Sequence, residues 1–263
     1  MGIKCSTVIP FSPPKINDLR KKAFKMYVLR AFFVYCYKDD MIEKFDEASF
    51  TILCDKLSAS DKVLAGIIDG YGYPPMWKRP NTFETFVHII LEQQVSLASA
   101  LSALNKMREK VKDIQPENLL MLTDEEFRAC YFSRQKTLYV KNLAEAMLNN
   151  HIDLNEMEKL PDDDIRSKFI KLKGIGNWTI DIYLMFVLQR TDIFPAGDLA
   201  AVNALKQLKK LPKETSKEEL LAIAANWQPY RTIATMLLWH YYLSSLSRKK
   251  MTRRKQEAGF LDR

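Results

Sequence analysis

Apolar residues recur at three- and four-residue spacing along most of the chain, the period of amphipathic helices. Glycine is scarce, with 8 among 263 residues. In "FETFVHIILEQQVS" the apolar positions form one buried stripe, and Asn81 with Glu84 is expected to form a capping box at its start. No strand–helix alternation indicates a parallel sheet. The pattern therefore predicts an almost all-α protein.

The same pattern sets the expected elements and divisions of the chain. An irregular tail (1–14) precedes a basic amphipathic helix (15–40), and Met41 is a hypothetical second start. We expect an accessory N-terminal extension (1–40), a folded domain (41–247) and a basic C-terminal tail (248–263). After 40 the expected helices cover 41–58, 60–69, the segment after Asn81, 97–112, 116–120, 124–130, 134–149, 162–171, 177–190, 199–209, 216–226 and 229–247.

Charge and residue usage narrow the function classes. The net charge of +8 favours a polyanionic partner, either nucleic acid or an anionic membrane surface. The most apolar N-terminal run, Tyr27–Tyr37, is too short to span a bilayer and contains Arg30, so no membrane role is expected. The four cysteines are scattered and the three histidines lie far apart, which predicts no iron–sulfur cluster and no zinc site. No signal peptide is visible, so reduced thiols in the cytoplasm are expected.

The turn "KGIG" (173–176) carries the first candidate chemistry. Gly174 and Gly176 permit positive φ and close backbone approach. The N–H groups of Ile175, Gly176 and Asn177 are expected to be free at the positive end of the next helix, where a phosphate binds without side chains. A glycine bend that serves packing alone is the alternative.

A carboxylate follows in the loop "FPAGD". Asp198 precedes the expected helix 199–209, where aspartate is a favoured N-cap. The same carboxylate could carry chemistry, and the two roles are compatible.

The combined segment "LKGIGNWTIDIYLMFVLQRTDIFPAGDLA" resembles the helix-hairpin-helix and Gly/Pro-Asp signature of the DNA glycosylase superfamily that includes endonuclease III. Within that superfamily the sequence is most similar to the bacterial 3-methyladenine DNA glycosylase II (AlkA-like) family. The segments "FETFVHIILEQQVSLASA", "FSRQKTLYVKNLAEA" and "NWQPYRTIATMLLW" also match. The resemblance runs from about Leu53 to His240. The β-rich N-terminal domain of longer members has no counterpart here.

The resemblance implies two helical subdomains around a cleft and a base-excision-repair enzyme that flips and removes alkylated purines. Asp198 matches the catalytic aspartate, which would stabilise a cationic sugar or activate water. No cofactor is implied, apart from a monovalent cation at the hairpin. The hairpin residues implied to bind DNA are Lys173, Gly174, Ile175, Gly176, Asn177 and Thr179.

Trp178 decides the subclass. Glycosylases that also cut the backbone carry a lysine nucleophile at this position, which forms a Schiff base. The indole offers instead a face on which a cationic base can stack. We therefore expect a monofunctional glycosylase without lyase activity. A tryptophan that only packs the hairpin is the alternative.

Other site residues are implied less sharply. The base pocket is expected to include Gln93, Gln94, Tyr183 and Trp77 besides Trp178; Ile182 stands where the family carries an aromatic residue. Phe132 or Arg134 is the candidate wedge that fills the gap left by the flipped base, and Lys136 would contact phosphate. Phe132 could equally pack in the core.

The expected partner is damaged double-stranded DNA, bound by a monomer associated with the nucleoid. A non-catalytic helix-hairpin-helix DNA-binding protein is the alternative function, since such a module would keep the hairpin and the basic tail. It would have no need for both Asp198 and Trp178.

Overall fold

The computed structural model describes the backbone of residues 44–261 and the side chains of residues 44–247. The chain divides into Met1–Ile42 and Glu43–Arg263. The predicted N-terminal extension (1–40) and the hypothetical start at Met41 lie outside the described residues.

The prediction of an all-α fold is confirmed, since the described residues hold one isolated bridge, between Lys44 and Arg190, and otherwise helices and loops. The described helices are α2 (Glu47–Ser60), α3 (Lys62–Tyr71), α4 (Phe83–Glu92), α5 (Leu97–Val111), α6 (Pro116–Leu120), α7 (Asp124–Ala129), α8 (Arg134–Leu148), α9 (Leu154–Met157), α10 (Asp162–Phe169), α11 (Asn177–Phe186), α12 (Leu199–Leu208), α13 (Lys217–Ala224), the 3₁₀ turn η1 (Ala225–Trp227) and α14 (Arg231–Leu261).

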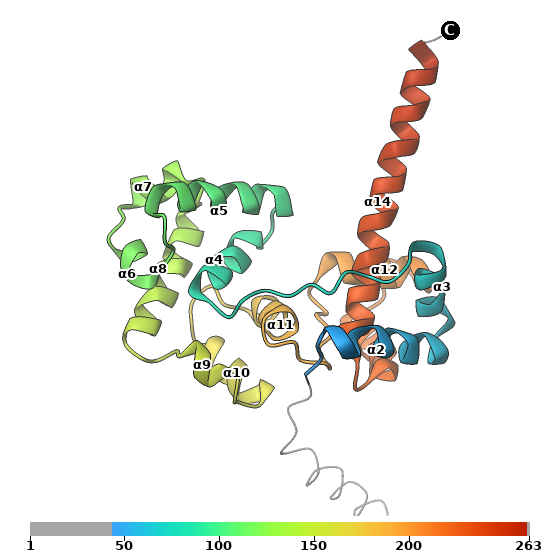
Figure 1. Ribbon diagram of the computed structural model, residues 1–263, viewed down its shortest axis with the longest axis horizontal. Coiled ribbons are helices and arrows are strands. Elements are labelled where there is room, and N and C mark those ends of the chain that lie inside the picture. The colour runs from blue at the N-terminus through green and yellow to red at the C-terminus, as the bar shows by residue number, and fades with distance from the viewer. Residues whose placement is uncertain (1–43, 262–263) are drawn as a thin grey trace, which may run out of the picture. The chain divides into compact units, whose positions relative to one another are not determined.

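The helices of this unit form two groups on either side of α11 (Figure 1). In one group α4 packs against α5, α8 and α11, while α8 also packs against α6 and α7. In the other group α14 packs against α2, α3 and α12. The chain passes between the groups twice, through residues 72–82 and through the loop after α11. Residues that follow α11 can therefore join the two groups.

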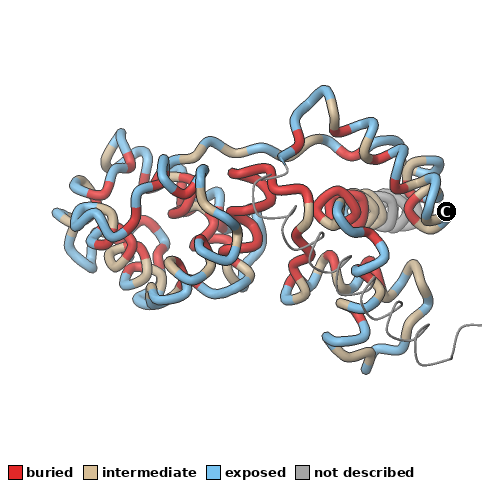
Figure 2. Tube along the Cα trace, turned by 90° about the horizontal axis from the view of Figure 1, so that it is seen from below, coloured by how far each residue is buried: buried red, intermediate tan, exposed pale blue. Residues whose placement is uncertain are grey.

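Helix α11 lies at the centre because it is apolar on nearly all sides. Every residue from Thr179 to Phe186 is buried, as expected for a helix enclosed by neighbours. Buried positions concentrate in the middle of the described chain (Figure 2). The ring of Tyr183 packs against those of Phe86 and Phe169, which come from α4 and α10. The hairpin that opens α11 is thus mounted on a rigid core.

The loop 72–82 is fixed to this core through Arg79. Its amide donates to the Phe186 carbonyl over 2.8 Å, and its guanidinium donates both of its terminal N–H groups to the buried carboxylate of Glu92. A paired buried charge is tolerated because the bidentate geometry satisfies both partners. The pair sets the path of the loop that carries Trp77.

Several sequence-based boundaries differ from the structure. The helix expected over 41–58 begins at Glu47, and the helix expected over 177–190 ends at Phe186. Helix α4 is capped by Thr82, whose Oγ1 accepts from the Thr85 amide, whereas Asn81 Oδ1 accepts from the Tyr183 hydroxyl. Helix α14 continues to Leu261, so the backbone of the predicted basic tail is helical as far as that residue. Within the described part of the chain, no helix combines the length and apolarity needed to cross a bilayer.

Candidate active site

The hairpin between α10 and α11 leaves one helix end open. The Ile175 amide donates to the Leu172 carbonyl and the Ile175 side chain is buried, so the prediction of a free Ile175 N–H is wrong. Gly176 is the N-cap of α11, and none of the described side chains caps it. Gly176, Asn177 and the preceding Lys173 are exposed. The open positive end of α11 can therefore accept an anion.

Gly174 is required by both backbone angle and space. Its φ is +93°, in the region that glycine adopts without strain. A Cβ at this position would fall inside the ring of Tyr139 on α8. The hairpin therefore packs directly on α8 at the level of its second turn.

Gln93 secures the hairpin from α4. Its side-chain Nε2 donates to the Gly174 carbonyl and to Thr179 Oγ1, each over 2.9 Å. Both amide hydrogens are thereby used, so the structure reassigns Gln93 from the base pocket to support of the hairpin. Thr179 is buried, and its hydroxyl accepts the hydrogen bond from Gln93. The predicted DNA contact of Thr179 is therefore not made by its side chain and stays a prediction for its backbone N–H.

Asp198 receives donors from three directions. Its Oδ1 accepts the Ala201 amide at 2.8 Å, which makes it the N-cap of α12, and also accepts Trp239 Nε1 at 2.9 Å. Its Oδ2 accepts Trp178 Nε1 at 2.9 Å. The side chain is 6% exposed. The carboxylate thus joins α11, α12 and α14, and the predicted capping role is confirmed.

Aromatic rings surround this carboxylate on the α14 side. Trp239 lies edge-on to Trp77 and to Phe186, with ring centroids 6.2 and 5.5 Å apart. Trp77 and Trp178 are half-buried, as is Trp239. Such edge-to-face contacts fix ring orientation as well as burying area. Trp77 thus contacts the ring that donates to Asp198, and its predicted place in the base pocket stays a prediction.

Tyr183 does not belong to this site. It is completely buried, and its hydroxyl donates to Asn81 Oδ1 over 3.0 Å. Burial raises the pKa of this phenol well above its usual value. The predicted place of Tyr183 in the base pocket is wrong, because its ring belongs to the aromatic core between α4, α10 and α11.

The turn between α7 and α8 displays a different aromatic residue from the one predicted. Phe132 is buried with its ring against Phe127, so it cannot act as the wedge. Tyr131 is 67% exposed with φ +65°, a backbone conformation that costs about 1–3 kcal/mol outside glycine. Arg134 at the start of α8 is exposed. Strain held at a displayed aromatic ring indicates a functional position.

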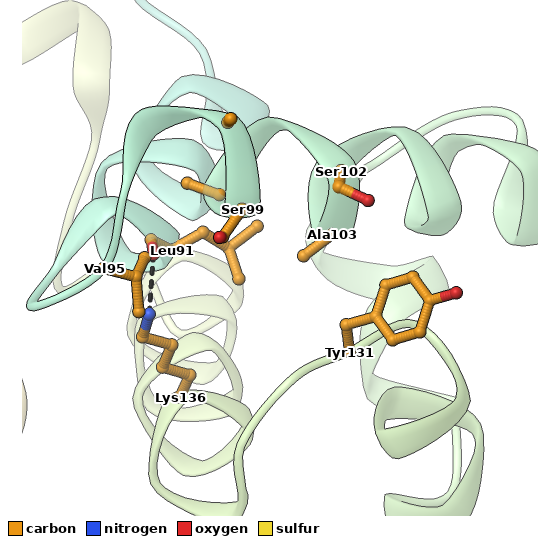
Figure 3. A pocket seen from close by; sticks show the side chains of 9 residues that line it. Leu91, Val95, Ser99, Ser102, Ala103, Tyr131 and Lys136 are labelled. Carbon is orange, nitrogen blue, oxygen red and sulfur yellow. Dashed lines mark hydrogen bonds between the residues drawn. The ribbon is translucent and has the colours of Figure 1, made fainter. Parts of the chain in front are cut away.

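A cavity of about 420 Å³ lies beside Tyr131 (Figure 3). Small side chains of α5, including Ser99, Ser102 and Ala103, leave this space open. On its far wall the Lys136 amine donates to the Leu91 carbonyl over 2.6 Å, and burial lowers the pKa of Lys136. This hydrogen bond uses one N–H of the Lys136 ammonium group, so the predicted contact with phosphate can use only the remaining N–H groups.

Gln94 lies between the hairpin support and the cavity. It is exposed with φ +59°, and it follows Gln93 and precedes Val95, which lines the cavity. The hairpin, the α4–α5 turn and the cavity therefore occupy a continuous stretch of the molecule. Its predicted role in the base pocket stays a prediction.

Sequence reasoning missed two residues, Trp239 and Tyr131. Trp239 is the last residue of the matching segment "NWQPYRTIATMLLW", which was a signal that could have found it. Tyr131 stands one position before the matching segment that begins at Phe132. Which of two adjacent aromatic residues in a tight turn is exposed cannot be read from a sequence period, so no signal identified Tyr131.

Among the described residues no three histidine, cysteine, aspartate or glutamate side chains come together as metal ligands. The Leu172 and Gly174 carbonyls each accept one hydrogen bond and keep a second lone pair, so the hairpin retains oxygens that suit a monovalent cation. That cation stays a prediction.

Replacing Gly174 by alanine should lower the free energy of unfolding by about 1–3 kcal/mol or more, because φ +93° and the Tyr139 ring both oppose a Cβ. Gly176→Ala is the matched control: its φ is −101° and nothing lies within 4 Å of an added Cβ. Urea unfolding of both variants checks this. Equal stabilities would contradict the described hairpin.

Comparisons with known proteins agree with this arrangement. Residues 87–229 match the model of the HhH-GPD superfamily base excision DNA repair proteins. DNA-3-methyladenine glycosylase 1 of Schizosaccharomyces pombe is 30% identical over 68% of this chain and 80% of its own length. The Bacillus subtilis protein YfjP is 28% identical over 67% of this chain, which spans 64% of that relative.

A solved structure shows the same fold. The Schizosaccharomyces pombe 3-methyladenine DNA glycosylase Mag1, in complex with abasic DNA, superposes with a TM-score of 0.64. The match is 28% identical and covers 71% of this chain and 94% of that one. Family model, relatives and fold agree, and the chain belongs to the HhH-GPD superfamily of base excision DNA repair proteins.

Proposed function

We propose that this protein is a monofunctional DNA glycosylase that removes alkylated purines from damaged double-stranded DNA in base excision repair. The observation that carries the proposal is the Asp198 carboxylate, held by two tryptophans next to the open helix end of a helix-hairpin-helix motif. The Schizosaccharomyces pombe relative is named for removal of 3-methyladenine, and the similar solved structure holds abasic DNA. For the present protein, the monomeric state and the association with the nucleoid stay predictions.

The hairpin would hold one phosphate of the DNA strand. Gly176 and Asn177 are exposed at the positive end of α11, and Lys173 adds a positive side chain on the same turn. Backbone N–H groups at a helix start bind phosphate without reading sequence. This contact sets the register of the strand and therefore the nucleotide that reaches Asp198.

Asp198 would act on the sugar of that nucleotide. Cleavage of the N-glycosidic bond builds positive charge on the deoxyribose, and a fixed carboxylate stabilises that charge or orients the attacking water. An alkylated purine already carries positive charge and leaves without prior protonation. One carboxylate is therefore sufficient for this class of base.

The residue at position 178 argues against a second activity. A lyase route requires an amine that attacks the sugar and forms a Schiff base. Trp178 occupies that position, and its N–H is directed at Asp198. Hydrolysis by water is the route that this chemistry supports.

The half-buried indoles of Trp77, Trp178 and Trp239 offer aromatic surface for a cationic base. Tyr131 replaces Phe132 as the wedge that enters the stack when the base is flipped out. Gln94, exposed on the neighbouring turn, stands where it can contact the same gap.

Asp198→Asn should abolish release of 3-methyladenine and 7-methylguanine from alkylated DNA, while binding to DNA with an abasic-site mimic is kept. Asparagine caps a helix as well as aspartate, so the fold should survive. Base release assays and fluorescence anisotropy measure the two effects. Unchanged release would contradict the mechanism; lack of release by the wild-type protein, with DNA binding, would favour the non-catalytic alternative.

Borohydride treatment during turnover should trap no covalent protein–DNA adduct, because no amine occupies position 178. A lyase of the same superfamily provides the positive control. An adduct on denaturing gels would refute the monofunctional assignment.

Tyr131→Gly should weaken binding to duplex DNA containing an abasic-site mimic by about 10-fold, the scale of one lost aromatic–base stack. Glycine relieves the φ +65° strain, so the thermal midpoint should stay or rise. Anisotropy and differential scanning fluorimetry report the two quantities.

Met121→Gly is a matched control for the Tyr131 variant, since it removes another large apolar side chain that is 75% exposed, on the turn after α6. Its DNA affinity should equal that of the wild type. Equal affinity of the Tyr131→Gly variant would remove Tyr131 from the DNA interface.

A further inference from the structure

The geometry of Asp198 limits which of its oxygens can react. An ionised carboxylate offers about four acceptor positions, two on each oxygen. On Oδ1 both are taken, by the Ala201 amide and the Trp239 indole. On Oδ2 the Trp178 indole takes one. Among the described donors nothing takes the fourth, so one acceptor position on Oδ2 is left open.

We propose that Trp178 and Trp239 are positioning residues that lock this carboxylate so that it acts on sugar or water through Oδ2 alone. The proposal rests on the proposed glycosylase function and deepens it. In this proposal Trp178 orients the Asp198 carboxylate in addition to any stacking on the base. Trp239, which the sequence did not single out, orients the same carboxylate.

Indoles suit this task for an electrostatic reason. Trp Nε1–H donates one hydrogen bond, carries no charge and cannot remove the carboxylate proton or supply one. A lysine, arginine or histidine held against Asp198 would neutralise the negative charge that a cationic sugar requires. In the described residues the ion pairs involve other carboxylates, and none joins a basic side chain to Asp198. The two indole donors, Trp178 and Trp239, form a clamp that orients the Asp198 carboxylate and preserves its negative charge.

The clamp is held from behind. Trp239 packs edge-on against Trp77 and Phe186, and the Arg79 guanidinium lies 5.8 Å from the centre of the Phe186 ring. Arg79 is itself paired with buried Glu92. The loop 72–82 thus fixes the ring that orients Asp198, although it lies far from Asp198 in the sequence.

The molecule contains a matched comparison. Trp227 Nε1 donates to Asp61 Oδ2 over 2.9 Å, and Lys209 Nζ pairs with the same oxygen. Asp61 caps α3 through its other oxygen, Oδ1, which accepts the Val63 amide, and this indole–carboxylate bond has no part in the proposed chemistry. It provides a control for loss of an indole donor as such.

Trp239→Phe and Trp178→Phe each remove one donor and keep an aromatic ring. Each should lower the single-turnover rate of base release about 10- to 100-fold, the value of a hydrogen bond to a charged group, with DNA affinity within about twofold of wild type. Trp227→Phe should lower the unfolding midpoint and leave the rate unchanged. A wild-type rate in Trp239→Phe would overturn the proposal.

Indole proton exchange measured by NMR tests the clamp without activity. The four tryptophans give four indole signals, assigned by the phenylalanine variants. In Asp198→Ala the Trp178 and Trp239 protons should both exchange faster, with Trp227 unchanged. In Asp198→Asn the amide oxygen keeps the Oδ1 partners, so the NH₂ group faces Trp178, and only Trp178 should exchange faster.

The outcomes separate the two proposals. Wild-type protein that releases no alkylated base overturns the proposed function. An active wild type with unchanged Trp239 exchange in Asp198→Ala overturns the clamp alone. Should Trp239→Phe fail to fold, the Asp198 variants still decide, because they leave every tryptophan in place.

Discussion

The arrangement of this molecule depends on a single carboxylate that three helices share. Asp198 ends the loop after α11, caps α12, and accepts one indole N–H from α11 and another from α14. These bonds connect the two groups of helices at the point where the chain passes between them. A carboxylate buried to this degree requires donors for its lone pairs, so the fold and the site impose the same requirement. Stability and chemistry are therefore coupled at this residue.

The hairpin and Trp178 meet at the N-terminal end of one short helix, α11. Gly176 leaves the start of α11 open, and Trp178, in its first turn, donates to Asp198. In the proposed function, the distance between the bound phosphate and the Asp198 carboxylate is set within a few residues of one helix. Gln93 and the Tyr139 ring fix the hairpin from α4 and α8, and Phe186 and Trp77 fix Trp239. Residues that are remote in the sequence therefore hold the hairpin and the Trp239 ring in place.

The structure, unlike the sequence, identifies the turn between α7 and α8 as an exposed surface that carries an aromatic side chain. Tyr131 and Gln94 are both exposed at positive φ on neighbouring turns, and buried residues anchor each turn. Phe132 serves as such an anchor, with Phe127. A strained, exposed aromatic ring next to an open cavity is consistent with a binding surface, whereas burial at Phe132 is consistent with packing.

The helical period determined most of the element order, and the hairpin with Asp198 determined the family, because both signals lie in short contiguous stretches. Local pattern could not tell which side chains face the site. Tyr183 and Trp178 lie on one helix; packing buries the first among Phe86 and Phe169, while the second reaches Asp198. Trp239 and Gln93 acquire their partners across long separations in sequence. Tertiary structure alone decided these roles, since hydrogen bonds between distant residues leave no periodic trace in the chain.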